Sequence, residues 1–206
     1  MNLHEIGNKY GTDKVYKSST HQKSTLNIYD KLFNNTFNLK DKLKILEIGV
    51  REGPSIKMLL DYFPNSEVYG LDIEECPIEL KKIKRFHFIK GDQSKLEDLD
   101  KLLELCDEFD VIIDDGSHLI KDFIFTYNYL INNLHEKGIY IIEDLYNCYE
   151  FWNFKNPCYV NKNGEEFNNF ISDLNYKIHH SRQEYDWSPI FSIQTYPGLL
   201  AIKKSL

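Results

Sequence analysis

An α/β fold built on a mostly parallel sheet is predicted by two features of the sequence. Between residues 43 and 142, short apolar runs typical of buried strands alternate with stretches whose apolar residues recur at helical spacing. Near the C-terminus, Pro197-Gly198 is a turn dipeptide between two runs with strand composition. Five parallel strands followed by a terminal antiparallel hairpin, with helices on both faces of one seven-stranded sheet, account for both features.

The hydrophobic period sets the expected order of elements. Ser94 and Glu97 have capping-box spacing at the start of one helix, and Gly138 would separate the next helix from the fifth strand. Strands are expected at residues 43–48, 67–73, 86–89, 110–114, 139–142, 190–196 and 199–203, and helices at residues 54–63, 94–108, 118–134 and 167–178.

Composition excludes several classes of protein. The 206 residues, 42% of them apolar and 14% aromatic, suit a single globular domain over residues 1–206. The net charge of -7, with lysine and arginine thinly spread, argues against a nucleic-acid partner. Neither a leader segment nor a run near the ~20 apolar residues of a membrane helix is present, so a cytoplasmic protein without a membrane span is expected. Four widely spaced cysteines predict reduced thiols.

Two acidic clusters stand where apolar runs end. Asp114-Asp115-Gly116-Ser117-His118 follows the fourth expected strand, and Glu143-Asp144 follows the fifth. Ligands bind at the carboxyl ends of parallel strands, and neighbouring strands lie about 5 Å apart, so both clusters could share one cation. Oxygen ligands without cysteine favour Mg²⁺, Mn²⁺ or Ca²⁺ over zinc, and Mg²⁺ is the expected ion. Because side chains alternate along a strand, Asp115 is expected to face the metal, while Asp114 would cap a helix or contact a cofactor.

A glycine-containing turn joins the first expected strand to the first helix of this region. It runs from Glu47 to Gly53, with glycines at positions 49 and 53. A dinucleotide-binding turn, G-x-G-x-x-G, needs its middle glycine close to a pyrophosphate, and here Arg51 stands in that place. The turn therefore suits S-adenosylmethionine, which has no pyrophosphate, better than NAD.

Polar residues follow the second and third strands on the same side. The Asp72 carboxylate could accept hydrogen bonds from both ribose hydroxyls of a nucleoside, or it could be a capping or surface group. Asp92 or Gln93 could contact the adenine edge, although Asp92 could equally stabilise the start of the following helix.

Taken together, these motifs resemble the metal-dependent sugar O-methyltransferases of the macrolide-tailoring type, the macrocin and mycinamicin methyltransferase group. This resemblance implies a class I, Rossmann-like methyltransferase fold. The stretches that carry it are KYGTDK (9–14), ILEIGVREGPSIKMLLDYFPNSEVYGLDI (45–73), GDQ (91–93), IIDDGSH (112–118), GIYIIEDL (138–145) and the SIQTY strand (192–196).

The resemblance also implies roles for individual residues. Asp115, Glu143 and Asp144 would bind Mg²⁺ (or Mn²⁺), and His118 would be the general base. The cation would lower the pKa of a sugar hydroxyl, and His118 would take its proton as the oxygen attacks the sulfonium methyl of S-adenosyl-L-methionine. Cofactor contacts are expected from Glu47, Gly49, Gly53, Asp72, Ile73, Asp92, Gln93 and Asp114.

Two segments stand outside the regular alternation. Residues 1–42 would form an N-terminal segment over the cofactor, as the resemblance implies for residues 10–14, or those residues could simply lie at the surface. Residues 147–189 contain Tyr149, Phe151, Trp152 and Phe154 without a clear period. They would form a lid or acceptor-binding insertion, or a plain irregular connection.

The function expected from the sequence is O-methylation of a sugar hydroxyl, on a nucleotide-linked sugar, a glycan or a natural product. A catechol-type O-methyltransferase is the alternative enzyme, because the aromatic cluster could stack on a ring, and an oxidoreductase is a weaker one. A non-catalytic cofactor-binding protein is the alternative from a different class. The expected partner is a small carbohydrate, and a homo-oligomer is compatible with the sequence.

Overall fold

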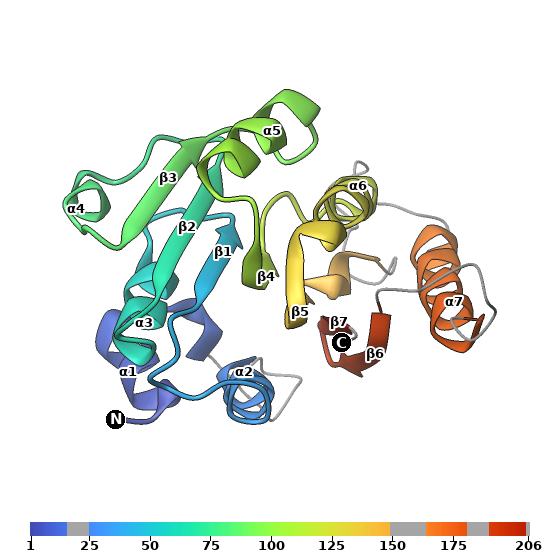
Figure 1. Ribbon diagram of the computed structural model, residues 1–206, viewed down its shortest axis with the longest axis horizontal. Coiled ribbons are helices and arrows are strands. Elements are labelled where there is room, and N and C mark those ends of the chain that lie inside the picture. Colours follow the sequence, from blue (N-terminus) through green and yellow to red (C-terminus); the bar gives the residue numbers. More distant parts are fainter. Residues whose placement is uncertain (16–24, 149–163, 181–189, 205–206) are drawn as a thin grey trace.

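A computed structural model describes residues 1–15, 25–148, 164–180 and 190–204 of the chain. Its strands form one sheet in the order β3-β2-β1-β4-β5-β7-β6 (Figure 1). The strands are β1 (Lys44–Ile48), β2 (Glu67–Asp72), β3 (Phe86–Lys90), β4 (Phe109–Asp114), β5 (Leu134–Ile142), β6 (Ile190–Tyr196) and β7 (Leu199–Lys204).

Strands β1 to β5 pair in parallel, while β7 runs antiparallel to both β5 and β6. The predicted seven-stranded sheet with a terminal hairpin is confirmed. The helices are α1 (Leu3–Tyr10), α2 (Thr25–Asn34), α3 (Pro54–Tyr62), α4 (Ile78–Lys81), α5 (Leu96–Leu105), α6 (Ile120–Leu130) and α7 (Glu165–His180), with short 3₁₀ turns η1 (Asp13–Val15), η2 (Ile131–Asn133) and η3 (Leu145–Cys148).

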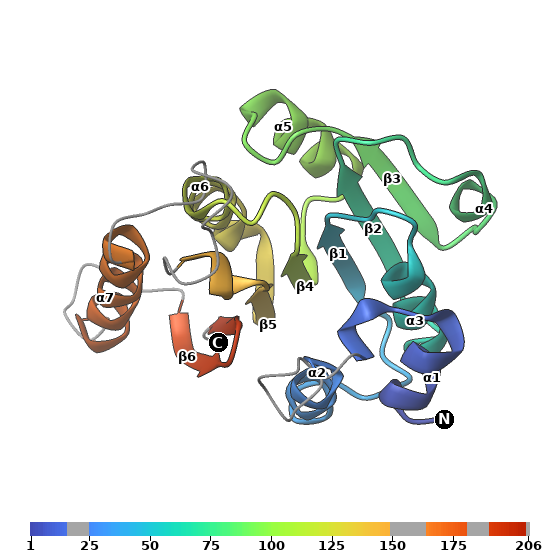
Figure 2. The same cartoon turned by 180° about the vertical axis from the view of Figure 1, so that it is seen from behind.

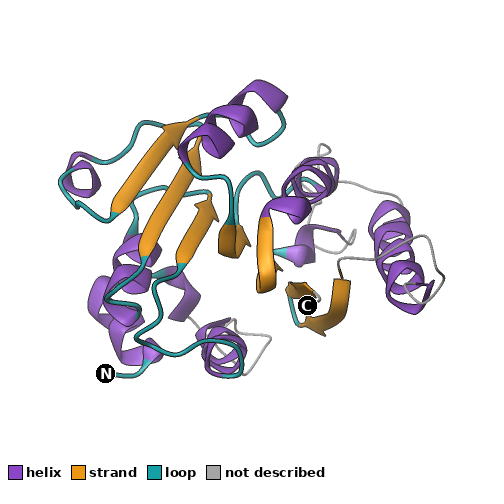
Figure 3. Ribbon diagram, viewed as in Figure 1, coloured by secondary structure: helices purple, strands orange, loops and turns teal. Residues whose placement is uncertain are grey.

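Successive side chains along the strands point alternately into two separate hydrophobic cores. Ile45 points to the face covered by α1, α2 and α3, whereas its neighbour Leu46 points to the face covered by α5, α6 and α7. Figure 2 shows the N-terminal helices gathered on one side of the sheet, and Figure 3 shows helices on both sides of the strands. Both faces are buried, which explains why the parallel strands read as unbroken apolar runs.

Helix α1 is well specified by its sequence. Asn2 caps its first turn, with the side chain accepting a hydrogen bond from the Glu5 amide while the Glu5 carboxylate accepts one from the Asn2 amide. Gly11 ends the helix in the left-handed conformation. Leu3 and Ile6 are buried in the core, so this segment is packed against the sheet domain rather than lying loosely on its surface.

The predicted capping box at Ser94 is wrong. Helix α5 begins at Leu96, and its N-cap residue Lys95 makes no side-chain cap. Instead, the Asp92 carboxylate accepts hydrogen bonds from the backbone amide and the hydroxyl of Ser94. An aspartate can form a short turn by accepting hydrogen bonds from the residue two positions later. Here that turn forms in place of the predicted helix cap.

The predicted boundary at Gly138 is also wrong. Helix α6 ends at Leu130, and β5 already begins at Leu134, so Gly138 lies inside the strand. The pairing of β4 with β5 shifts register between Phe109 and Val111. At this irregularity a Cβ atom on Gly138 would stand 2.9 Å from the backbone oxygen of Asp110, so the glycine serves a bulge rather than a helix end.

No helix in the described ranges is both long enough and apolar enough to cross a bilayer. The predicted 147–189 insertion falls largely outside the described residues, since only η3 and α7 represent it. The aromatic cluster at residues 149–154 is among the residues that the structure does not describe.

Candidate functional site

The acidic clusters meet at the carboxyl ends of β4 and β5. Asp114 pairs with Ile48 of β1 on one side and with Ile142 of β5 on the other. Strand order reverses between β1 and β4, because β2 and β3 extend from β1 in one direction while β5 extends from β4 in the other. Crevices at such a reversal are the usual ligand sites of open α/β sheets.

A pocket of about 300 Å³ opens at this reversal. It includes the predicted cofactor residues Gly49, Asp72, Ile73, Asp92 and Gln93. Its lining continues to Asp115 and His118, so the expected cofactor residues share this cavity with one of the expected metal ligands and with the expected base. The remaining predicted site residues, which do not line this pocket, are Glu47, Gly53, Asp114, Glu143 and Asp144.

The turn between β1 and α3 owes its shape to Asp72. One carboxylate oxygen accepts hydrogen bonds from the amides of Val50 (2.7 Å) and Arg51 (2.8 Å). The other accepts one from the Glu74 amide at 2.9 Å. Asp72 therefore holds in place a turn that forms part of the pocket wall, and it lines the pocket itself.

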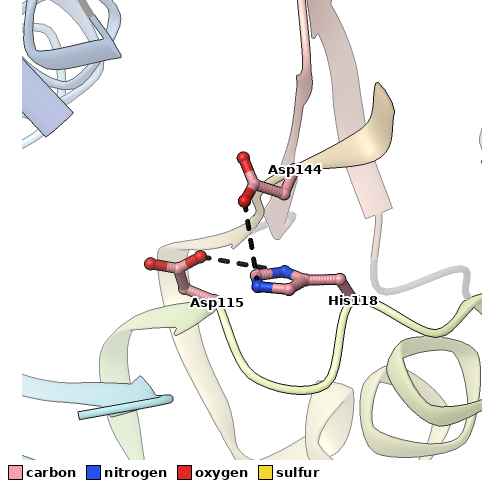
Figure 4. Close-up of side chains that lie close together, drawn as sticks. All are labelled: Asp115, His118 and Asp144. Carbon is pink, nitrogen blue, oxygen red and sulfur yellow. Dashed lines mark ion pairs between the residues drawn. The ribbon is translucent and has the colours of Figure 1, made fainter. Parts of the chain in front are cut away.

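Asp115, His118 and Asp144 form a compact group with potential metal ligands. One ligand atom from each residue lies within 4.8 Å of the others. His118 Nδ1 is 3.9 Å from Asp115 Oδ1, and His118 Nε2 is 3.8 Å from Asp144 Oδ2, as Figure 4 shows. The two carboxylates, without a thiolate, offer the oxygen ligands that Mg²⁺ or Mn²⁺ prefers.

Unusual backbone conformations accompany this group. His118 has φ of 57° and Asp144 has φ of 53°, and Arg51 at the pocket has φ of 49°. Among the described non-glycine residues, Lys137 alone joins them in the positive range. Residues held in this sparsely populated region concentrate at functional sites, because surrounding contacts must over-determine them.

Glu143 is buried, and one of its carboxylate oxygens is bound by two neighbours. Its Oε1 accepts hydrogen bonds from the Lys14 ammonium at 2.6 Å and from the Tyr29 hydroxyl. Lys14 also donates to Asp115 Oδ2 at 2.6 Å. Burial raises the pKa of Glu143 above its ordinary value, and the Lys14 ammonium opposes that shift. Burial lowers the pKa of Lys14, but Asp115 and Glu143 more than compensate and hold it well above 10.5.

Glu47 is the most deeply buried of the predicted cofactor residues. Its Oε2 accepts a hydrogen bond from the Ser55 hydroxyl at 2.6 Å. Among the residues that the structure describes, Oε1 has no hydrogen-bond partner, and it lies 3.6 Å from Lys14 Nζ. Burial raises the pKa of Glu47 to about 7, although Lys14 lowers it. Its surroundings connect it to the acidic cluster through Lys14.

Asp114 belongs to a buried network behind the pocket. Its carboxylate accepts hydrogen bonds from Gln93 Nε2 at 2.9 Å and from the Tyr140 hydroxyl at 3.1 Å. Burial raises the pKa of Asp114 to about 6, against the effect of these hydrogen bonds. Gln93 Oε1 in turn accepts from the Ser117 amide at 2.8 Å, so the Gln93 side chain fixes the loop that carries His118.

Sequence reasoning missed Tyr29 and the place of Lys14. Lys14 lies in the KYGTDK stretch, whose only expected role was to cover the cofactor, and a motif of that kind was the available signal. Tyr29 lies in the ordinary amphipathic pattern of α2 and carries no local signal. Both residues meet Glu143 only because the chain folds α2 and η1 against the strand tips.

Comparisons with known proteins agree with the fold. A family model described as a methyltransferase domain matches residues 39–193. Mycinamicin VI 2''-O-methyltransferase of Micromonospora griseorubida is 33% identical over 129 residues, which are 59% of this chain and 31% of that protein. Demethylmacrocin O-methyltransferase of Streptomyces fradiae is 31% identical over 128 residues, again 59% of this chain and 31% of the relative.

Among solved structures, the chain is similar to the MycE methyltransferase of the mycinamycin biosynthetic pathway, determined in complex with Mg, SAH and mycinamycin VI. The TM-score is 0.79 at 26% sequence identity, and the match covers 100% of this chain and 54% of that one. The chain thus spans about half the length of this solved relative, and its matched part about a third of the curated ones.

Proposed function

Because the chain belongs to the methyltransferase-domain family, we propose that it is an S-adenosylmethionine-dependent, Mg²⁺-dependent O-methyltransferase acting on a sugar hydroxyl. One observation carries this proposal: a single pocket runs from Gly49 and Asp72 to Asp115 and His118. A methyl donor held at one end and a hydroxyl held at the other would thus be neighbours. The sugar O-methyltransferases among the relatives favour a carbohydrate acceptor.

The donor set fits a divalent cation. Asp115 and Asp144 present carboxylate oxygens to the same place as His118, and Glu143 is tied to Asp115 through Lys14. We assign Asp115, Glu143 and Asp144 as the residues that would hold Mg²⁺. When bound, the cation would lower the pKa of a sugar hydroxyl, and S-adenosylmethionine would supply the methyl group.

His118 is the proposed general base. Its side chain is partly exposed and lines the pocket, where a hydroxyl proton would be within reach. Asp144 Oδ2, 3.8 Å from Nε2, would stabilise the imidazolium that forms when the proton is taken. Gln93, through the Ser117 amide, keeps the loop of His118 in place.

Direct contacts with the cofactor are proposed for five of the eight residues expected from the sequence. Gly49, Asp72, Ile73, Asp92 and Gln93 line the pocket and could touch the cofactor directly. For the other proposed cofactor residues, Glu47, Gly53 and Asp114, the geometry supports an influence through the turn and the buried network instead.

The alternative functions make different predictions. A catechol-type acceptor rested on Tyr149, Phe151, Trp152 and Phe154, which lie outside the described residues. A non-catalytic protein would bind the cofactor, and its function would not change when His118 is replaced. The absence of a nucleic-acid partner and the homo-oligomeric state stay predictions.

Ligand-induced thermal stabilisation tests the cofactor. S-adenosylhomocysteine should raise the melting temperature and NAD should not, because a ligand that binds only the native state stabilises it. Stabilisation by NAD alone would overturn the methyltransferase proposal.

A methyl-transfer assay tests the reaction and its metal. With labelled cofactor and a panel of nucleotide sugars, glycans and catechols, at least one sugar should be methylated. EDTA should abolish the transfer and Mg²⁺ should restore it. Full activity in EDTA after exhaustive dialysis would show that the reaction needs no metal. Methylation of catechols alone would show that the acceptor is a catechol and not a sugar.

A further inference from the structure

Lys14 joins the carboxylates of three adjacent strands. Its Nζ atom lies 2.6 Å from Asp115 Oδ2 and 2.6 Å from Glu143 Oε1, and 3.6 Å from Glu47 Oε1. Glu47 is in β1, while Asp115 and Glu143 directly follow β4 and β5. The Lys14 side chain is only 3% exposed, so this ammonium is a built-in cation beneath the strand tips rather than a surface charge.

The Lys14 ammonium contacts the acidic group from only one side. Asp115 Oδ2 accepts a hydrogen bond from Lys14, while Asp115 Oδ1 faces His118 Nδ1 at 3.9 Å. Figure 4 shows the second carboxylate oxygen of Asp115 directed away from His118. The acidic group therefore has an inner end neutralised by Lys14 and an outer end formed with His118 and Asp144, where Asp115 and His118 line the pocket.

Glu143 is held from two directions. Lys14 donates to its Oε1, and so does the Tyr29 hydroxyl from α2. A charge-assisted hydrogen bond is shorter and stronger than a neutral one, and residues that bind a metal ligand from behind orient it toward the metal. Buried carboxylates this close together would repel one another without such a counter-charge.

We propose that Lys14, supported by Tyr29, is a positioning residue for the divalent cation. It would hold Asp115 and Glu143 side by side and ready to ligate, and it makes the N-terminal segment part of the metal site. This inference rests on the proposed function and adds to it residues that do not themselves touch the metal. It predicts that Mg²⁺ affinity depends on a lysine contributed by η1.

The test is calorimetric titration of Mg²⁺ into the EDTA-stripped and dialysed full chain. Lys14→Met keeps the length of the side chain and removes its charge. We expect Mg²⁺ affinity to fall about 10- to 100-fold, the usual effect of removing an outer partner of a metal ligand. Affinity for S-adenosylhomocysteine should stay within about 3-fold, since Lys14 does not line the cofactor pocket.

Lys9→Met is the matched control. Lys9 lies in the same N-terminal segment but pairs with Asp61 at the surface, at 2.7 Å, and its loss should leave Mg²⁺ affinity unchanged. If circular dichroism shows that Lys14→Met does not fold, Tyr29→Phe replaces it, because it deletes only the hydroxyl that binds Glu143. An affinity loss of about 10-fold is then expected.

Equal Mg²⁺ affinity in the wild type and the folded variant would overturn the positioning role and leave the proposed function intact. Tighter binding in Lys14→Met would overturn it as well, because the ammonium would then be a competitor of the metal. A wild-type chain that binds no Mg²⁺ would overturn both this inference and the metal dependence of the proposed function. The titrations therefore distinguish the two failures.

Discussion

Gly49 lies directly against the backbone of Asp115: a Cβ atom added to Gly49 would stand 2.0 Å from the Asp115 carbonyl oxygen. Gly49 also has φ of 89°, a conformation that side chains rarely adopt. The turn after β1 and the acidic loop after β4 are thus in backbone contact. This contact joins the two halves of the site.

Gly49→Ala should destabilise the protein by about 3 kcal/mol, from backbone strain and the clash together. Urea unfolding measures it. Gly11→Ala is the control, because Gly11 has φ of 69° but nothing within 4 Å of an added Cβ, and should cost only about 1 kcal/mol. If the two variants lose the same free energy of unfolding, the backbone at Asp115 must shift to accommodate the added Cβ atom without a loss of stability.

Asp72→Ala should weaken S-adenosylhomocysteine binding about 10-fold or more. The variant deletes the acceptor for the Val50 and Arg51 amides, so the turn must be ordered when the ligand binds. Calorimetry measures the affinity. Glu52→Ala, an exposed acid of the same turn, is the control and should bind normally. Unchanged affinity in Asp72→Ala would show that this carboxylate shapes neither the turn nor the ligand contact.

His118→Ala should lower kcat by about 10²- to 10⁴-fold, because the positioned base is lost. Affinities for Mg²⁺ and S-adenosylhomocysteine should stay within about 3-fold of the wild type if the imidazole is a base rather than a ligand. Single-turnover kinetics and calorimetry measure the two effects. His135→Ala, on β5 and half exposed, is the control. A parallel fall in Mg²⁺ affinity would instead make His118 a metal ligand, as its place beside Asp115 and Asp144 allows.

Glu47 should make the metal-free protein less stable as the pH rises. Burial raises the pKa of Glu47 from 4.5 to about 7, so the folded state holds a proton that the unfolded state has released. The stability that this carboxyl contributes is fully present below pH 4.5 and is lost as the pH rises through 7. The free energy of unfolding falls by about 3 kcal/mol over this range.

Glu47→Gln cannot release a proton, so it should remove this part of the pH dependence. Urea unfolding in EDTA at pH 5 and pH 8 measures the difference for both proteins. Glu52→Gln, at an exposed acid beside Arg51, is the control and should leave the slope between these pH values nearly as it is in the wild type. An identical pH dependence in wild type and Glu47→Gln would show that Glu47 is ionised throughout.

Much of the fold could be predicted because its signals are local. The strands that end in Ile48, Asp72 and Asp114 are short apolar runs, and each was placed within a residue or two. The errors occurred where local signals compete. Asp92 closes its own turn in place of a cap at Ser94, and Gly138 serves a bulge in β5 instead of ending a helix.

The sequence by itself determined which residues stand at the strand tips, because hydrophobic period and turn residues are read over a few neighbours. It placed Asp115, Glu143 and Asp144 after apolar runs and Asp72 after another. Only the tertiary structure decided what these residues do to one another. The contacts of Lys14 with Glu143 and of Gly49 with Asp115 join segments far apart in the chain. Burial, which raises the pKa of Glu47, likewise arises only when helices cover that face of the sheet.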